Sequence, residues 1–186
     1  MDHNELLKKC LKGNTGAQKD LYNQFAASMF GICYRYTKSV ADAEDVLQEG
    51  FVKVFHNLHH YRHEGELGAW MRRIMVNTAL TYLKQNKRYS SELSYDEVNL
   101  HPVSAENPVI NLQVKELADL IRQLPTGCQT IFNLHAVEGY THVEIGEILG
   151  IHEGTSRSQY ARARAIMITW IEKRNENVKQ QRYAGK

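Results

Sequence analysis

Apolar residues recur along most of the chain at steps of three and four. In residues 17–36 they fall at Leu21, Phe25, Met29, Ile32 and Tyr36, and residues 41–58 and 67–85 carry the same period. This spacing gathers apolar side chains on one face of a helix. The alternation of beta-branched and polar residues that marks strands is absent, and the chain has only three prolines. The pattern predicts an all-α protein.

The helical pattern is interrupted between residues 89 and 112. This stretch holds four acidic residues, no Lys or Arg, and two of the three prolines. A loop of that length argues against one compact domain. We therefore expect two small helical domains joined by a flexible acidic linker. The expected boundaries are 1–88 for the first domain, 89–112 for the linker, 113–175 for the second domain and 176–186 for a basic tail.

The second domain has the pattern of a helix-turn-helix. Thr141 and Glu144 form a capping box that begins one helix, and Gly150 ends it. A second helix is expected from about Glu153, with these polar and basic residues: Arg157, Ser158, Gln159, Arg162 and Arg164. Such an arrangement places a recognition helix in the major groove. A helical hairpin with a solvated basic face is the alternative.

The helix expected over 70–88 carries a mixed polar stripe. At about 100° per residue, one side collects Trp70, Arg73, Asn77, Thr81, Lys84 and Arg88. Cations suit phosphates, an indole offers a stacking surface, and Asn can read a base edge. The stripe favours binding of a nucleic-acid strand. The alternative is that Trp70 anchors a core and the cations only solubilise the surface.

Residues 42–55, DAEDVLQEGFVKVF, form an acidic helix in a chain whose other helices carry basic faces. Its core side is expected to hold Ala43, Leu47, Gly50, Phe51, Val54 and Leu58. The opposite side holds Asp45, Gln48 and Glu49, with Val52 among them. An acidic face alone is usually solvated. An apolar residue within it favours a protein interface, since interfaces mix apolar spots with charged surrounds.

Composition excludes several classes of protein. The net charge of +2 is too small to indicate a polyanion partner by itself, and no segment is apolar enough to span a bilayer or act as a signal peptide. Three separated cysteines without metal-ligand spacing indicate a reducing cytosol and no disulfide scaffold. No catalytic motif is present, so we expect no enzyme and no cofactor.

Four histidines stand at three- and four-residue steps and could meet on one helical face: His56, His59, His60 and His63. Such imidazoles would suit a transition metal. No carboxylate or cysteine completes the set, so we expect no metal site.

Three segments in this order resemble a bacterial sigma factor of the compact extracytoplasmic-function class (group IV). They are DAEDVLQEGFVKVF at 42–55, GAWMRRIMVNTALTYLKQNKR at 68–88 and the helix-turn-helix block at 124–165. The resemblance covers about residues 15–172. It implies a cytoplasmic subunit that binds core RNA polymerase and promoter DNA and has no membrane insertion of its own. It also implies control by an anti-sigma factor, usually a membrane-associated one.

The resemblance implies a role for each domain. The first would bind polymerase and melt the −10 promoter element, and the second would read the −35 element. Core polymerase binding is expected at Asp42, Glu44, Asp45, Gln48, Glu49 and Val52. Contacts to the −10 element are expected from the loop 61–66 and from Tyr61, Arg62, His63, Trp70, Arg73, Asn77, Lys84 and Arg88. Contacts to the −35 element are expected at Arg157, Ser158, Gln159, Arg162 and Arg164.

Three positions depart from the family pattern. Gly146 replaces the usual Ala, which should loosen its helix by up to about 1 kcal/mol. Ser156 replaces a buried Val or Ile, and Gln159 replaces a common Arg. Two other functions are considered: a two-domain DNA-binding regulator that never joins polymerase, and a His-rich metal-dependent enzyme. The acidic helix distinguishes the first of these, because a plain regulator has no need of it.

Overall fold

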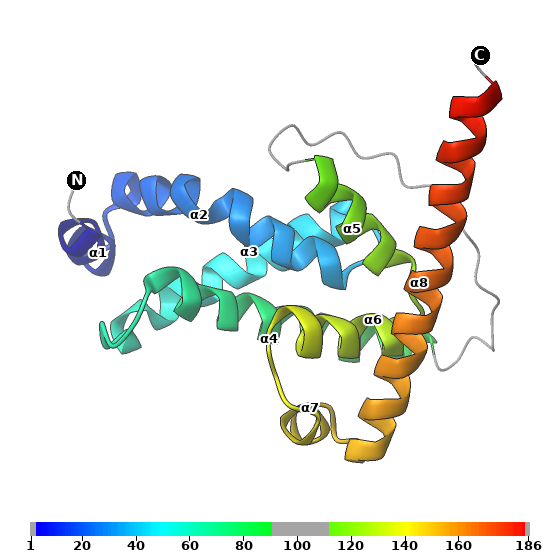
Figure 1. Cartoon of the computed structure of the whole chain (residues 1–186). Coiled ribbons are helices and arrows are strands. Elements are labelled where there is room, and N and C mark those ends of the chain that lie inside the picture. Colours follow the sequence, from blue (N-terminus) through cyan, green and yellow to red (C-terminus); the bar gives the residue numbers. More distant parts are fainter. Residues whose placement is uncertain (1–2, 91–111, 185–186) are drawn as a thin grey trace. The chain divides into compact units, whose positions relative to one another are not determined.

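The structure, a computed structural model, describes residues 3–90 and 112–184, with side chains over 5–86 and 115–173 (Figure 1). Every regular element in these ranges is a helix, which confirms the all-α prediction. The chain divides into two compact units, Met1–Asn111 and Leu112–Lys186. No helix in the described ranges is long and apolar enough to cross a membrane.

The first unit is built from four α-helices and a short 3-10 helix. They are α1 (His3–Leu11), α2 (Thr15–Tyr36), α3 (Val40–Asn57), η1 (Leu58–His60) and α4 (Leu67–Ser90). Side chains define the turn from α2 into α3. The hydroxyl of Thr37 donates to the Cys33 carbonyl at 3.1 Å at the end of α2. Ser39 then accepts a hydrogen bond from the Asp42 amide at 3.0 Å, which caps the first turn of α3.

Helices α2, α3 and α4 enclose the core of the first unit. Of the apolar positions expected on α2, four are buried: Leu21, Met29, Ile32 and Tyr36. Phe25 is half-buried. Gly50 allows α3 to approach α4 closely, because a Cβ at this position would lie 2.2 Å from the sulfur of Met75, which is fully buried. The residue without a side chain therefore sets the spacing between these two helices.

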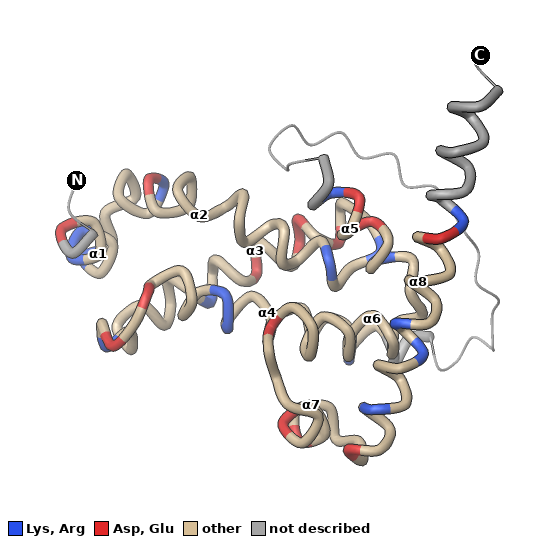
Figure 2. The backbone as a smooth tube through the Cα atoms, viewed as in Figure 1, with Lys and Arg blue, Asp and Glu red and all other residues tan. Residues whose placement is uncertain are grey.

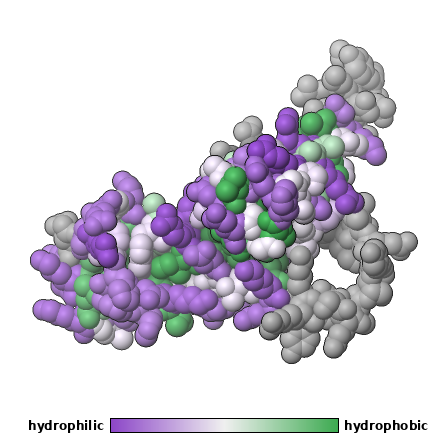
Figure 3. Space-filling view, turned by 90° about the horizontal axis from the view of Figure 1, so that it is seen from below, coloured by the Kyte–Doolittle hydropathy of each residue, from purple (hydrophilic) through white to green (hydrophobic). Residues whose placement is uncertain are grey.

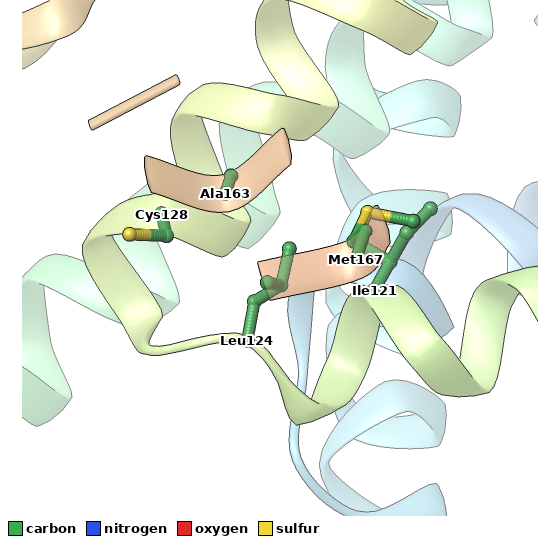
Figure 4. Packing of buried hydrophobic residues seen from close by; sticks show 5 residues of the cluster. All are labelled: Ile121, Leu124, Cys128, Ala163 and Met167. Carbon is green, nitrogen blue, oxygen red and sulfur yellow. The ribbon is translucent and has the colours of Figure 1, made fainter. Parts of the chain in front are cut away.

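The second unit contains α5 (Leu112–Gln123), α6 (Thr126–Phe132), the π-helical turn η2 (Asn133–Val137), α7 (His142–Leu149) and α8 (Glu153–Ala184). Its core joins α5 and α6 to α8. Figure 4 shows its buried side chains: Ile121, Leu124, Cys128, Ala163 and Met167. These contacts fix the long helix α8 against the short helices that precede it.

Helices α7 and α8 form the predicted helix-turn-helix. The capping box of Thr141 and Glu144 is present, and Gly150 ends α7 in the left-handed conformation with φ of 67°. Gly146 lies against the turn, since a Cβ there would stand 2.8 Å from the Ile151 carbonyl oxygen. The Gly146 substitution noted in the sequence thus has a second consequence beyond lower helix propensity. It allows the turn to pack tightly on α7.

The observed helix ends differ from the expected domain limits by a few residues. Helix α4 continues to Ser90 and α5 begins at Leu112, so most of the expected linker, residues 91–111, lies outside the described residues. Helix α8 continues to Ala184, so the segment expected as a basic tail from 176 is helical up to that residue. Residues 155–184 contain no Gly or Pro, the residues that most often end a helix, which explains why α8 continues to Ala184.

Candidate nucleic-acid and protein interfaces

The outer side of α3, here the α3 face, consists of Asp42, Glu44, Asp45, Gln48, Glu49 and Val52. All are exposed except Asp42, which is half-buried. The opposite side of the helix is buried in the core through residues such as Ala43, Leu47 and Val54. The sequence therefore predicted correctly which side of α3 faces outward.

Val52 is 67% exposed, the highest fraction of any large apolar side chain in the described ranges. Figure 3 shows one side of the surface, on which hydrophilic residues dominate and hydrophobic residues form small separate patches. An isolated exposed apolar residue is ordinary on a protein surface. Its position within an acidic face gives Val52 more weight, because the neighbouring carboxylates could hold a partner around it.

Side chains of α4 form hydrogen bonds with α3 next to the α3 face. The hydroxyl of Tyr82 makes a hydrogen bond with the Asp42 carboxylate, and burial together with this contact raises the pKa of Tyr82 to about 12. Lys53 pairs with Glu49 at 2.6 Å, and its amino group also lies 3.4 Å from the hydroxyl of Thr78 on α4. The α3 face is thus oriented by contacts from α4 that the sequence pattern did not predict.

The polar stripe of α4 points outward along the helix. Arg73, Asn77 and Lys84 are exposed, and Trp70 is half-buried. The helical position of Arg88 is described, whereas its side chain lies outside the described residues. Exposed cations with a half-buried indole at one end give a surface on which phosphates and bases could both be held.

A pocket of about 470 Å³ lies beside the start of α4. It is lined by Leu7, Gln24, Phe25, Tyr61, His63, Gly65, Glu66, Leu67 and Gly68. Four of these residues belong to the loop between η1 and α4, the loop expected to contact the −10 element, and Leu67 and Gly68 are the first two residues of α4. Leu7 from α1 and Gln24 and Phe25 from α2 complete the wall. These contributions could not be predicted from helical periodicity, which does not show which surfaces meet.

The loop at this pocket has a defined conformation. The hydroxyl of Tyr61 donates to the Gly65 carbonyl, which closes the loop on itself. His63 has a φ of 59°, a left-handed conformation that is uncommon for a residue with a side chain. The Tyr61 ring lies 4.7 Å from that of His63 and 5.5 Å from that of Trp70. Arg62 is exposed beside them.

The four histidines between 56 and 63 are not gathered together. The rings of His59 and His60 lie 3.9 Å apart, whereas His63 packs on Tyr61 at the pocket. Among the residues that the structure describes, no three side chains of the metal-binding types are placed to hold one ion.

The exposed side of α8 brings together four of the five residues expected at the −35 element: Arg157, Ser158, Arg162 and Arg164. Figure 2 shows Lys and Arg recurring along this helix. Arg157 pairs with Glu153 one turn before it. Gln159, the fifth expected residue, does not lie on this exposed side. It is half-buried and accepts a hydrogen bond from the Cys128 thiol at 2.9 Å. Its side chain therefore faces α6.

A cluster that the sequence did not predict lies behind the exposed side of α8. The rings of His135 on η2 and His142 on α7 are stacked with centroids 4.1 Å apart. Tyr160 on α8 packs edge-on against His135 at 4.6 Å. His142 also makes a hydrogen bond of 2.9 Å with Ser156, which is fully buried. The only sequence signal was the replacement of a buried apolar residue by Ser156.

Comparison with known proteins decides the family. Residues 21–89 match the family described as Sigma-70 region 2, and residues 115–167 match Sigma-70, region 4. The chain is 31% identical over 173 residues to the ECF RNA polymerase sigma-E factor of Haemophilus influenzae, with 87% of this chain and 91% of the relative covered. The chain belongs to the extracytoplasmic-function (ECF) sigma factors. It therefore acts in transcription initiation with RNA polymerase.

Other relatives agree with this sigma factor assignment. The ECF RNA polymerase sigma factor SigW of Bacillus subtilis is 25% identical over 172 residues, with 87% of this chain and 92% of the relative covered. The sigma factor RpoE of Bartonella quintana, solved in complex with the anti-sigma factor NepR, has a similar fold. Its TM-score is 0.52 at 18% identity, with 83% of this chain and 98% of that chain covered. The two sequence relatives are ECF sigma factors, which favours this function over the regulator and the metal-dependent enzyme.

Proposed function

We propose that this sigma factor recognises and melts the −10 element with its first unit and reads the −35 element with its second. The observation that carries the proposal is the pocket beside the start of α4, the helix on which the cations Arg73 and Lys84 are exposed. A pocket of that kind suits an extruded base, and the cations suit the phosphates on either side of it.

The pocket offers the contacts that an unstacked base requires. Tyr61 supplies an aromatic ring, and Gln24 and Glu66 supply polar groups at the wall. Base stacking on an aromatic side chain contributes about 1–3 kcal/mol, comparable to the few kcal/mol needed to extrude a base. Trp70, beside Tyr61, extends the aromatic surface toward the stripe of α4. The strand would run from the pocket past Arg73.

The exposed side of α8 supports the proposed reading of the −35 element. Its arginines can contact guanine edges or phosphates in the major groove. Arg157 is held by Glu153, which fixes its guanidinium near the start of the helix. Replacing Arg157 and Arg162 with Ala should abolish sequence-selective binding to duplexes that the wild-type chain selects from a random pool. Retained selectivity would remove α8 from the proposed reading surface.

The α3 face is the proposed site for core polymerase. Its exposed carboxylates and the exposed Val52 would meet a partner with basic groups around an apolar spot. Binding of the polymerase here would leave the pocket and the α4 stripe available to DNA. The proposed place of action is the cytoplasm, where polymerase and the chromosome are found.

An anti-sigma factor is the further partner that we propose. The support is that the Bartonella quintana relative in fold was solved in complex with one. Such a partner would act by covering the surfaces that polymerase needs. Mixing the chain with core polymerase and following the loss of the complex on addition of a candidate inhibitor would test this point.

A further inference from the structure

Three parts of the second unit meet at one cluster, here the histidine stack: His135, His142, Ser156 and Tyr160. His135 belongs to η2, His142 is the first residue of α7, and the other two lie on α8. The stacked imidazoles are inclined by 22°, and Tyr160 meets His135 at 77°. The stack therefore joins the helix-turn-helix to the helix that precedes it.

Hydrogen bonds fix the orientation of both imidazoles. Nδ1 of His135 lies 2.8 Å from the Tyr140 carbonyl oxygen. Because a carbonyl only accepts, Nδ1 of His135 must carry the proton. Nδ1 of His142 lies 2.9 Å from the hydroxyl of Ser156, which is 0% exposed. This hydrogen bond ties the first residue of α7 to the residue just before Arg157 on α8.

The position of this hydrogen bond on α8 connects it to the residues proposed to contact DNA. Ser156 occupies the inner side of α8, one residue from Arg157 on the outer side. A buried hydroxyl without a hydrogen-bond partner costs free energy. We therefore expect α8 to shift or rotate if His142 moves away from the hydroxyl of Ser156. A small rotation of α8 would move Arg157 and Ser158 away from the base edges that they are placed to meet.

The groups around His142 favour its neutral form. Its ring faces His135 on η2, and Arg157, Glu153, Ser156 and Tyr160 on α8. Burial, then His135 and Arg157, lower the pKa of His142, and Glu153 opposes them. On α7 itself, the Glu144 carboxylate is engaged with Thr141 at the helix cap. Two protonated imidazoles stacked 4.1 Å apart would repel each other.

We propose that His142 is a positioning residue for the exposed side of α8, and that it holds this side in place only while the histidine stack is neutral. Selective binding to the −35 element by this chain therefore decreases on acidification. The inference rests on the proposed function, because it assigns regulation to the surface proposed to read the −35 element. It adds that promoter selection responds to pH through residues that touch no DNA.

Protonation has a second effect that must be separated from this one. Added positive charge near DNA strengthens binding to any duplex. Selectivity, the ratio of the affinities for a selected duplex and a scrambled duplex, cancels this common gain. The experiment therefore measures the ratio with the full chain bound to core polymerase. The duplex is one selected by the wild-type complex from a random pool.

For the wild-type chain we expect the ratio to fall about tenfold between about pH 8 and about pH 5, because repulsion between the two protonated, stacked imidazoles moves His142 away from the hydroxyl of Ser156. H142N places an amide near the position of Nδ1 and cannot be protonated, so its ratio should be constant over this range. H142A should show the low ratio at every pH. The matched control is H152N, which removes an exposed histidine directly before α8. Nδ1 of His152 accepts a hydrogen bond from the Gly154 amide, a role that the Asn side chain can fill.

An equal pH profile in the wild-type and H142N chains would overturn the inference while leaving the proposed function intact. The inference would also be overturned if the selectivity ratio of H152N, like that of H142N, did not fall on acidification. If the wild-type complex selects no duplex at any pH, the proposed −35 function fails and the inference fails with it. NMR of the histidine Cε1–H signals gives an independent measurement. The titration midpoint of His142 should change in S156A, and an unchanged midpoint would contradict the hydrogen bond.

Discussion

Val52 on the α3 face allows a direct test of the proposed polymerase site. The change is Val52→Glu, which places a carboxylate at the centre of the proposed interface. Since Val52 is exposed in the free chain, the substitution should change the free energy of unfolding by no more than about 0.5 kcal/mol. Any loss of polymerase binding would then report on the interface and not on folding.

The expected loss follows from the exposure of Val52. Full burial of a Val side chain contributes about 1.5–3 kcal/mol. With 67% of the side chain still exposed, an interface could recover about 1–2 kcal/mol of this amount. A carboxylate buried at the same place without a partner adds a further cost of about 1–3 kcal/mol. Together these effects should weaken the affinity for core polymerase at least about 30-fold.

The assay is fluorescence anisotropy of labelled chain titrated with core polymerase. The matched control is Leu11→Glu, which adds the same charge at another exposed apolar residue of the first unit. The control should bind as the wild type does. Wild-type affinity in Val52→Glu, or an equal loss in Leu11→Glu, would refute the assignment of the α3 face.

Four further predictions concern single positions. Gly50→Ala should lower the free energy of unfolding by about 1–2 kcal/mol in urea titrations, because Met75 must move within a packed core. Gly31→Ala, where an added Cβ meets nothing within 4 Å, should raise it by about 0.5–1 kcal/mol. Burial lowers the pKa of His142 from 6.5, so its contribution to stability should be full above pH 6.5, fall as the pH drops below that value, and level off below the folded-state pKa. Thermal unfolding against pH should show this step, and H142N should lack it. Tyr61→Ala should reduce promoter opening at least about tenfold, measured by 2-aminopurine fluorescence in the −10 element, with duplex binding unchanged.

Each of these predictions has an outcome that contradicts it. Equal stabilisation by both glycine substitutions would mean that Gly50 is not needed for the close approach of α3 to α4. The same pH dependence of unfolding in H142N would assign the step to another group. Normal opening by Tyr61→Ala would mean that the pocket does not hold a base during melting.

The local signals in the sequence predicted the helix-turn-helix well. Thr141, Glu144 and Gly150 act through neighbouring backbone atoms, so their effect is encoded within a few residues. The same holds for the outward position of Val52, because one helical period is enough to place it opposite the buried side of α3.

Contacts between elements distant in sequence could not be predicted in this way. Leu7 reaches the pocket because α1 packs on α2, and nothing in the spacing of α1 indicates that. Gln159 was expected to face DNA, but its amide is turned toward the Cys128 thiol on α6. The pairing of His142 with Ser156 spans a turn whose geometry is known only once the helices have packed. In each case the partner is set by tertiary packing, which a helical period does not specify.

Promoter-specific initiation in a purified system is the decisive test of the proposed sigma factor function. Core RNA polymerase, the full chain and a library of promoter fragments would be combined, and the transcripts sequenced. A sigma factor should yield transcripts that begin downstream of a shared −35 and −10 pair and that are absent without the chain. If core polymerase binds the chain but initiates at the same positions with or without it, the chain does not direct promoter selection.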